Sequence, residues 1–369
     1  MKKILLIFGT RPEAIKLCPL VHELRARREL QTVICVSGQH REMLAQVLKA
    51  FEVTPDYDLD VMLPKQSLSE LTMQILAGIE EVLNQECPDL VIVHGDTTTA
   101  LSSALACFYK SISIGHVEAG LRTYRITSPF PEEFNRQAID LMAQYYFAPT
   151  PLARKNLIRE GKPSERIFVT GNTGIDALRS TVRKEYTHPY LEWAKDSRLL
   201  LITAHRRENI GEPMRNMFAA IRRIMEAHGD VKAIYPIHLN PAVRKIVQSE
   251  LGNATRIQLI DPLDVVDFHN FMARCHLILT DSGGVQEEAP SLGKPVLVMR
   301  DTTERMEGIA AGTLKLVGTE EDTIFQAVHQ LLSKPREYAK MAKSKNPYGD
   351  GYASKRIADI LCAELVGNT

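Results

Sequence analysis

Short apolar runs, each followed by a longer segment with helical periodicity, recur along the whole chain. Each run is bounded by Gly, Asp, His or Ser, a pattern typical of parallel strands that are buried on both faces and alternate with helices. The pattern stops in a polar, aromatic stretch and then starts again. The predicted strands before the break are 2–8, 32–38, 89–96, 111–120 and 145–150, and those after it are 198–205, 232–238, 256–261, 277–283 and 295–300.

Two successive series of this kind predict an α/β protein with two doubly wound, Rossmann-like domains, and a chain of 369 residues is long enough for both. We assign 1–175 to the N-terminal domain and 176–350 to the C-terminal domain. The segment 351–369 has helical periodicity, and we expect this helix to pack back on the N-terminal domain. Sheets of this kind bind ligands at the carboxyl ends of their strands, so we expect polar residues there to face a cleft between the domains.

The composition argues against several classes of protein. Lys plus Arg and Asp plus Glu both number 45, so the chain lacks the basic excess of a nucleic-acid binder. The six cysteines are scattered, which favours reduced thiols and a cytoplasmic location. The apolar runs are too short for a signal peptide or for a membrane span, which needs about 18 residues. Motifs for zinc, calcium, dinucleotides and ATP are also missing, so we expect no metal, no cofactor and no nucleic-acid or membrane partner.

The loop after the first predicted strand carries two basic residues, Arg11 and Lys16. They stand where a helix begins, and the free N–H groups and dipole of a helix N-terminus favour an anion. The loop matches neither dinucleotide nor ATP motifs, so it points to a phosphate group of another ligand. The alternative is a plain strand-to-helix turn with a solvated arginine.

A glycine-rich turn at 281–288 follows a predicted strand of the second domain. Gly283 and Gly284 would let a diphosphate approach the backbone, and Ser282 can donate a hydrogen bond or cap the helix. Glu288, one turn further on, can accept hydrogen bonds from sugar hydroxyls. Phe268, ahead of the strand, could pack on a base. The alternatives are a tight turn with a helix cap and, for Phe268, a core aromatic.

Three carboxylates at or just after strand ends of the first domain are candidate acid–base groups: Asp96, Glu118 and Glu132. Converging acids can raise one another's pKa and so supply a proton donor and acceptor near neutral pH. Asp96 could instead cap a helix. Glu118 lies where an apolar strand meets a small-residue turn, so its charge needs a partner such as Arg122 or a ligand. The Pro-bounded loop at 128–131 is suited to hold Glu132, Glu133 and Arg136, although a surface turn held by salt bridges has the same pattern.

A histidine, His205, ends the first strand of the second domain, and two arginines follow it. Histidine can exchange a proton near pH 7, and the arginines can receive an anion. A structural histidine is the alternative. His238 and the pair Gln39 and His40 also lie at strand ends, where each alone is more readily structural.

The set of motifs resembles one family closely, the bacterial, non-hydrolysing UDP-N-acetylglucosamine 2-epimerases, whose fold is like that of GT-B glycosyltransferases. The resemblance covers nearly the whole chain, and the HRREN segment favours the non-hydrolysing branch. The matching motifs are GTRPEAIK (9–16), SGQHREM (37–43), HGDTTTA (94–100), HVEAGLRT (116–123), PFPEEFNR (129–136), TGNTGID (170–176), AHRREN (204–209), PIHLNP (236–241), TDSGGVQEE (280–288) and RDTTER (300–305).

The resemblance implies reversible conversion of UDP-N-acetylglucosamine to UDP-N-acetylmannosamine, by elimination of UDP to a glycal and re-addition, for synthesis of cell-surface polysaccharide precursors. It implies that the catalytic residues are Asp96, Glu118, Glu132 and His205. It implies that Arg11, Lys16 and Arg136 help to hold the substrate. The residues implied to hold UDP are Ser282, Gly283, Gly284 and Glu288, with Phe268 near the uracil.

The same resemblance implies a second nucleotide-sugar site, where UDP-N-acetylglucosamine acts as an allosteric activator, and a homodimer. The residues that match this second site are Gln39, His40, Gln66, Arg206 and His238. One position departs from the family, because Lys65 stands where arginine is expected, and lysine lacks the bidentate fork of arginine.

Three other functions remain open at this stage. A UDP-sugar-dependent glycosyltransferase of the same fold would need an acceptor. An epimerase of a related UDP-diacetamido sugar would use the same core groups. A non-catalytic nucleotide-sugar sensor would bind without turnover.

Overall fold

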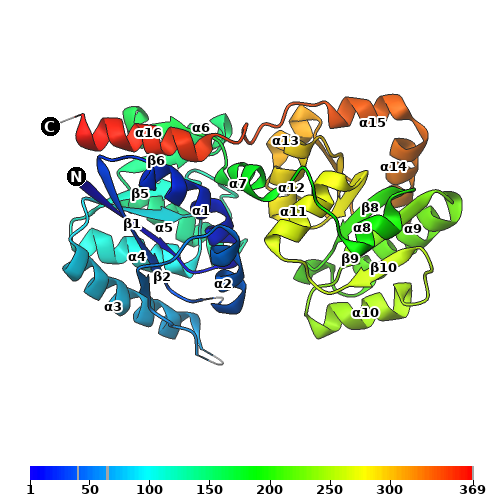
Figure 1. The fold of residues 1–369 in the computed structure, drawn as a ribbon, viewed down its shortest axis with the longest axis horizontal. Helices are drawn as coiled ribbons and strands as arrows, with labels where there is room; N and C mark the ends of the chain where they lie inside the picture. The colour runs from blue at the N-terminus through cyan, green and yellow to red at the C-terminus, as the bar shows by residue number, and fades with distance from the viewer. Residues whose placement is uncertain (40, 64–65, 368–369) are drawn as a thin grey trace. The chain divides into compact units, whose positions relative to one another are not determined.

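The structure is a computed structural model that describes residues 1–39, 41–63 and 66–367. It divides into two compact units, each built on one parallel sheet with helices around it (Figure 1). Unit 1 consists of Met1–Ser180 and Tyr348–Thr369, and unit 2 consists of Thr181–Pro347. The predicted α/β class with two doubly wound parallel sheets is confirmed.

Unit 1 contains a seven-stranded sheet in the order β3-β2-β1-β4-β5-β6-β7. The chain winds outward from β1 in both directions, and the right-handed crossover rule then puts helices on both faces. The strands are β1 (Lys2–Phe8), β2 (Leu30–Val36), β3 (Tyr57–Asp58), β4 (Leu90–His94), β5 (Ser113–Val117), β6 (Tyr145–Ala148) and β7 (Ile167–Val169). The helices are α1 (Arg11–Arg25), α2 (Arg41–Ala50), α3 (Leu68–Glu86), α4 (Thr98–Tyr109), α5 (Glu132–Met142), α6 (Pro151–Arg159), η1 (Ser164–Arg166), α7 (Thr173–Thr181) and α16 (Ala353–Val366).

The helices of unit 1 pack side by side in two groups. Helix α1 contacts both α2 and the C-terminal helix α16, and α4 contacts both α3 and α5. Strand β1 lies beneath them with Ile4 to Phe8 fully buried. Removing each such side chain from water contributes about 1.5–3 kcal/mol, so the central strands dominate the stability of the sheet.

Unit 2 contains a six-stranded parallel sheet in the order β10-β9-β8-β11-β12-β13. The strands are β8 (Arg198–Thr203), β9 (Val231–Pro236), β10 (Ile257–Ile260), β11 (Leu277–Thr280), β12 (Val296–Val298) and β13 (Leu314–Leu316). The helices are α8 (Pro189–Ala194), η2 (Arg207–Asn209), α9 (Glu212–Ala227), α10 (Pro241–Leu251), α11 (Val265–Arg274), α12 (Gly283–Glu288), η3 (Ala289–Leu292), α13 (Met306–Ala311), α14 (Glu321–Ser333) and α15 (Pro335–Ala342).

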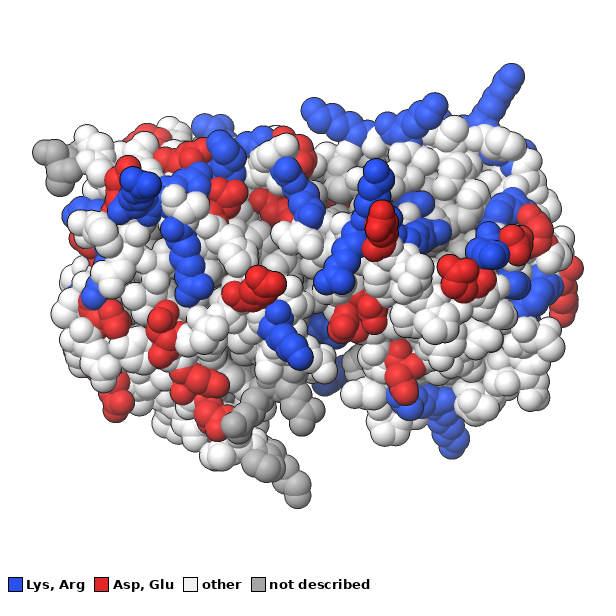
Figure 2. All heavy atoms as spheres, in the orientation of Figure 1, with Lys and Arg blue, Asp and Glu red and all other residues white. Residues whose placement is uncertain are grey.

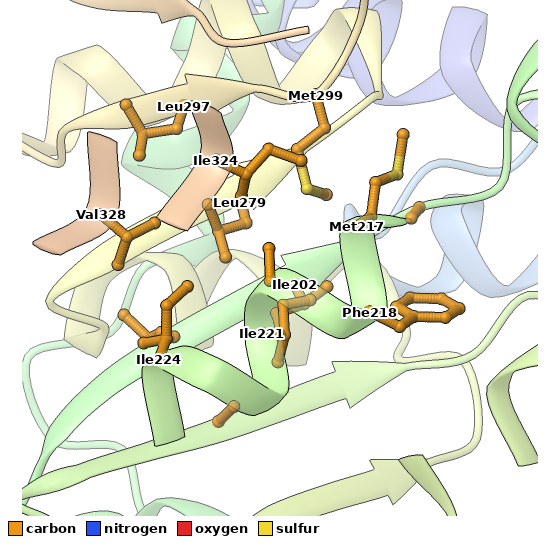
Figure 3. Close-up of a cluster of buried hydrophobic side chains, with 14 of the residues drawn as sticks. Ile202, Met217, Phe218, Ile221, Ile224, Leu279, Leu297, Met299, Ile324 and Val328 are labelled. Atoms are coloured by element: carbon orange, nitrogen blue, oxygen red, sulfur yellow. The ribbon is translucent and has the colours of Figure 1, made fainter. Parts of the chain in front are cut away.

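The core of unit 2 lies between this sheet and helices α9 and α14 (Figure 3). Phe218 and Ile221 of α9 belong to the same cluster of fully buried side chains as Ile202 of β8 and Leu279 of β11. Ile324 approaches the same cluster from α14. This amphipathic packing explains the helical periodicity that follows each strand in the sequence.

Three edge strands, β3, β7 and β13, were not predicted. They are two or three residues long, and each pairs with a neighbour on one side only. An edge strand needs no long apolar run, because it is covered less completely than a central strand.

The surface carries both signs of charge. On the face drawn in Figure 2, acidic and basic side chains are interspersed over both units, in keeping with equal numbers of the two in the sequence. Within the described part of the chain, no helix is long and apolar enough to cross a membrane.

Candidate active site

Two of the three predicted carboxylates of unit 1 follow adjacent strands. Asp96 lies two residues after the end of β4 and Glu118 directly after β5, and these strands pair in parallel. The Gly95 N–H donates to the Val117 carbonyl at 2.9 Å, which holds the two loops together. Because the carboxyl ends of neighbouring parallel strands share one edge of the sheet, both acids lie at the same edge.

Helix α5 supplies the third acid and a cation. Arg136 forms an ion pair with Asp96, and Asn135 donates to the Asp96 carbonyl at 2.8 Å. Glu132 lies one turn before Arg136, and its Oε2 atom is buried with no hydrogen-bond partner among the described residues. Such an unsatisfied buried oxygen is costly, so it marks a position suited to a ligand group.

The charge of Glu118 is balanced by Lys16 rather than by Arg122. Lys16 of α1 forms an ion pair with Glu118, and Asn172 donates to the same carboxylate at 3.2 Å. Arg122 binds Asp140 and Glu160 instead, so naming it as the partner of Glu118 was wrong. Sequence proximity misled here, because the cation, Lys16, lies 102 positions earlier in the chain.

The backbone at Glu118 is held in an uncommon conformation. Its φ angle is +69°, in the left-handed region that disfavours residues with a Cβ atom. Such strain is found where the surrounding structure fixes a functional side chain.

A buried histidine completes the surroundings of Glu118. The His94 Nε2 atom lies 3.6 Å from the Glu118 carboxylate and has no hydrogen-bond partner among the described residues. Burial lowers the pKa of His94 to about 3; the positive charges of Lys16 and His116 act in the same direction, against the opposing effect of Glu118. His94 is therefore neutral at physiological pH.

The loop between β1 and α1 is built around a buried carboxylate, Glu13. Thr10 caps α1 by accepting from the Glu13 N–H, and the Glu13 carboxylate accepts from the N–H groups of Gly9 and Thr10 at 3.1 and 2.8 Å. Glu13 also accepts from the Thr97 hydroxyl at 2.7 Å, which ties the loop to the residue after Asp96. Burial raises the pKa of Glu13. Glu13 was not among the predicted site residues, although Thr-x-x-Glu is the capping-box pattern.

Gly9 in the same loop has no room for a side chain. A Cβ atom there would come 1.9 Å from the Ser37 Oγ and 2.6 Å from the Thr99 Oγ1. The loop therefore approaches β2 and α4 closely, while Arg11 beside it is half-buried and Lys16 is buried.

In unit 2, a buried aspartate organises the segment around His205. Asp281 accepts from the main-chain N–H groups of His205 and Arg206, both at 2.8 Å, and from Asn209 at 3.2 Å. Its other oxygen, Oδ1, is buried without a hydrogen-bond partner among the described residues and lies 3.6 Å from the His205 Nδ1. The ring of His238 stacks on His205, with ring centres 5.2 Å apart. Burial lowers the pKa of His205.

The glycine-rich turn follows β11 and opens α12. The Ser282 N–H donates to the Thr280 hydroxyl at 2.9 Å, while the Ser282 side chain makes no capping bond to α12. A Cβ atom on Gly284 would meet nothing closer than 3.8 Å, whereas one on Gly283 would come 2.9 Å from the Arg305 guanidinium carbon. The turn therefore has an open side at Gly284.

The other predicted UDP contacts lie nearby in unit 2. Glu288 ends α12, is buried, and lies 3.5 Å from the His269 Nε2. Phe268 is half-buried on α11, one residue before that histidine. His269 had not been predicted, and a lone histidine on a helix gives no signal that would distinguish it from a core residue.

The residues predicted for a second nucleotide-sugar site fall in both units. In unit 1, Gln39 accepts from the Thr99 hydroxyl at 3.1 Å, and Gln66 donates to the Val61 carbonyl at 3.1 Å. In unit 2, Arg206 and His238 flank His205 as described above. His40 and Lys65 lie outside the described residues.

Within the described part of the chain, no group of three His, Cys, Asp or Glu side chains could hold a metal ion. The polar groups of both units are instead arranged as ion pairs and hydrogen bonds. Such groups suit acid–base chemistry on an anionic ligand.

Comparison with known proteins decides the family. A family model described as UDP-N-acetylglucosamine 2-epimerase matches residues 22–362. The UDP-N-acetylglucosamine 2-epimerase of Bacillus subtilis (strain 168) is 56% identical over 359 residues, which cover 97% of this chain and 94% of the relative. This chain belongs to the UDP-N-acetylglucosamine 2-epimerase family. The resemblance drawn from the motifs is confirmed.

Solved structures of family members have the same fold. The UDP-GlcNAc 2-epimerase from Neisseria meningitidis bound to UDP-GlcNAc matches with a TM-score of 0.91 and 47% identity, covering 97% of this chain and 99% of that one. The UDP-GlcNAc 2-epimerase from Methanocaldococcus jannaschii in complex with UDP-GlcNAc and UDP matches with a TM-score of 0.82 and 35% identity, over the same shares of the two chains.

Proposed function

We propose that this protein is a non-hydrolysing UDP-N-acetylglucosamine 2-epimerase, an isomerase that interconverts UDP-N-acetylglucosamine and UDP-N-acetylmannosamine. Family membership over nearly the whole chain supports the substrate, since the similar Neisseria structure is bound to UDP-GlcNAc. The product would serve as a precursor of cell-surface polysaccharide.

The observation that carries the proposal is the pairing of two carboxylates with two cations in unit 1. Glu118 is paired with Lys16, and Asp96 with Arg136, beside the unsatisfied oxygen of Glu132. Inverting a carbon next to the anomeric centre needs one group that removes a proton and one that returns it, together with cations that stabilise the departing diphosphate. Paired carboxylates and nearby basic residues are the groups that such a reaction uses.

The proposed reaction has two halves. A base removes the proton from C2, the C1–C2 double bond forms, and the C1–O bond breaks with its electron pair passing to UDP. An acid then returns a proton to C2 from the opposite face while UDP re-adds at C1. Each half conserves atoms and electrons, so no oxidant or reductant is needed.

We assign the acid–base work to Asp96, Glu118, Glu132 and His205. Arg11, Lys16 and Arg136 are proposed to bind the anionic parts of the substrate. In unit 2, the open side of the turn at Gly284 supports diphosphate binding, and the carboxylate of Glu288 supports a contact with ribose hydroxyls. Ser282, Gly283 and Phe268 complete the proposed UDP site.

Three finer features are also proposed. Gln39, His40, Gln66, Arg206 and His238 would bind a second UDP-N-acetylglucosamine as an activator, weakened by Lys65. The protein would act as a homodimer in the cytoplasm. The second site and the homodimer are supported by the resemblance of motifs, and the cytoplasmic location by the scattered cysteines.

The proposal is tested by following UDP-N-acetylglucosamine by NMR after addition of the purified protein, without any acceptor. We expect UDP-N-acetylmannosamine to accumulate to a constant ratio, with no free N-acetylmannosamine. Turnover only with an added acceptor would identify a glycosyltransferase, and tight binding without turnover would identify a sensor. Slow conversion, with much faster conversion of a UDP-diacetamido sugar, would identify the related epimerase.

A further inference from the structure

His116 is a fully buried histidine whose two ring nitrogens both have close partners. It lies on β5, two residues before Glu118. Its Nδ1 atom is 2.6 Å from the Asp140 carboxylate, and its Nε2 atom is 2.7 Å from the Gly95 carbonyl oxygen. Asp140, on α5, is also fully buried.

The partners determine the protonation state of the ring. A carbonyl oxygen can only accept a hydrogen bond, so Nε2 must carry a proton and donate it to Gly95. Asp140 also accepts from Arg122 at 2.6 Å and from the Gly120 N–H at 3.2 Å. The Arg122 guanidinium and the Gly120 N–H can only donate, and both stabilise a carboxylate, so Asp140 is ionised and accepts the second ring proton from Nδ1. His116 is therefore an imidazolium that donates from both nitrogens.

This cation joins the segments that carry the three proposed acid–base groups. The carbonyl it binds belongs to the peptide that precedes Asp96. Through Asp140 it reaches the N–H of Gly120, which closes the turn after Glu118. On α5, Glu132, Arg136 and Asp140 are spaced four residues apart, so they share one face of the helix. Asp140 therefore links the orientation of α5, and with it Glu132, to the ends of β4 and β5.

We propose that His116, held as a buried imidazolium between Asp140 and Gly95, is the positioning residue that sets the relative placement of Asp96, Glu118 and Glu132. The expected kinetic effect of replacing His116 rests on the proposed epimerase function. The protonation of both ring nitrogens does not. His116 touches no reacting atom and acts through the loops and the helix that it joins. Charged and titratable groups near it are Asp140, Arg122, His94 and, through Arg122, Glu160.

The protonation state is tested by NMR of the protein with ¹⁵N-labelled histidine, using His116→Gln to assign the signals. We expect both ring nitrogens of His116 to carry a proton, because each faces an acceptor. A signal from an unprotonated ring nitrogen of His116 would overturn the proposal. This measurement needs no turnover.

The positioning role is tested by the kinetics of His116→Gln. A glutamine side chain can still donate to the Gly95 carbonyl, but it carries no charge, and Asp140 then loses the hydrogen bond from the ring while it keeps those from Arg122 and Gly120. We expect kcat for epimerisation to fall about 100-fold, as for other misplaced catalytic groups, while KM and the affinity for UDP change less than about threefold. Loss of the cation also raises the pKa of nearby carboxylates, so the acidic limb of the kcat/KM profile moves to higher pH.

The matched control is His22→Gln. The His22 Nε2 atom also lies 2.7 Å from a main-chain carbonyl, that of Phe51, but His22 is exposed and belongs to no ion pair among the described residues. This variant should keep the kcat of the wild type. If folded His116→Gln keeps kcat within about threefold and an unmoved pH profile, the positioning role is refuted. If the wild type shows no epimerisation at all, the proposed function fails, and the NMR measurement still decides whether His116 is an imidazolium.

Discussion

Replacing Glu13 separates the hydrogen-bonding role of a buried carboxylate from the effect of its charge. In Glu13→Ala, the N–H groups of Gly9 and Thr10 lose their acceptor, and both are buried. Each orphaned donor costs about 1–3 kcal/mol, so local stability should fall by about 2–6 kcal/mol. In Glu13→Gln, the amide oxygen can accept from both N–H groups, while the amide nitrogen can donate to the Thr97 hydroxyl. We expect the glutamine variant to lie within about 1 kcal/mol of the wild type.

The effect of pH has a definite sign. Burial raises the pKa of Glu13 in the folded protein, so folding favours its protonated form. The resulting stabilisation of the folded protein is complete at pH values below the pKa of Glu13 in the unfolded chain. It is lost as the pH rises through the pKa of Glu13 in the folded protein. Glutamine does not titrate. The free energy of unfolding of Glu13→Gln, compared with that of the wild type, should therefore increase as the pH rises through this range.

Hydrogen exchange followed by mass spectrometry is the suitable assay, with peptides covering β1, α1 and the start of α4. If Glu13→Ala lowers the local stability by 2 kcal/mol or more, hydrogen exchange through local opening becomes at least about thirtyfold faster. The single tryptophan, Trp193, lies in unit 2, and its fluorescence serves as an internal control that should not change. Exchange in Glu13→Ala within twofold of the wild type would refute the reasoning, as would equal damage in Glu13→Gln.

Three further predictions concern single side chains. Glu118→Gln should lower kcat by at least about 100-fold in a folded protein. Its control, Glu80→Gln, alters an exposed ion pair with a lysine and should leave kcat unchanged. Equal activity of the two variants would remove Glu118 from the mechanism. Asp281→Asn should lower kcat at least about tenfold, because an amide N–H then faces the His205 ring nitrogen. Asp261→Asn, on the surface, serves as its control. Unchanged kinetics of Asp281→Asn would show that Asp281 only fixes the backbone. In a thiol titration of the native protein, exposed Cys87 should react first, and reaction of buried thiols at the same rate would contradict the packing. The buried thiols, which should react only after unfolding, are Cys18, Cys35, Cys107 and Cys275.

The central strands of both sheets were predictable because their burial leaves a direct trace in the sequence. Strand β4, for example, is a run of apolar residues that ends at His94, and Asp96 lies two residues further on. Candidate carboxylates could be found for the same reason, since parallel strands end at one edge of the sheet. The edge strands left no comparable trace.

The partners of the candidate groups could not be predicted, because they depend on contacts between distant segments. Lys16 reaches Glu118 across 102 positions of sequence, and Asp281 organises His205 across 76. The spacing of Glu132, Arg136 and Asp140 on α5 was available in the sequence and would have indicated that Asp140 faces the site. Nothing in the sequence alone could show that His116 binds a carbonyl and a carboxylate at once.

The central claim is that C2 loses its proton to the protein and regains one from solvent. It is tested by incubating the protein with UDP-N-acetylglucosamine in deuterated water and measuring the C2 position of both epimers by NMR and mass spectrometry. We predict that the UDP-N-acetylmannosamine formed carries deuterium at C2, and that recovered UDP-N-acetylglucosamine gains it as the reaction reverses. Product that retains its original C2 hydrogen would contradict elimination and re-addition, whatever the rate at which it forms.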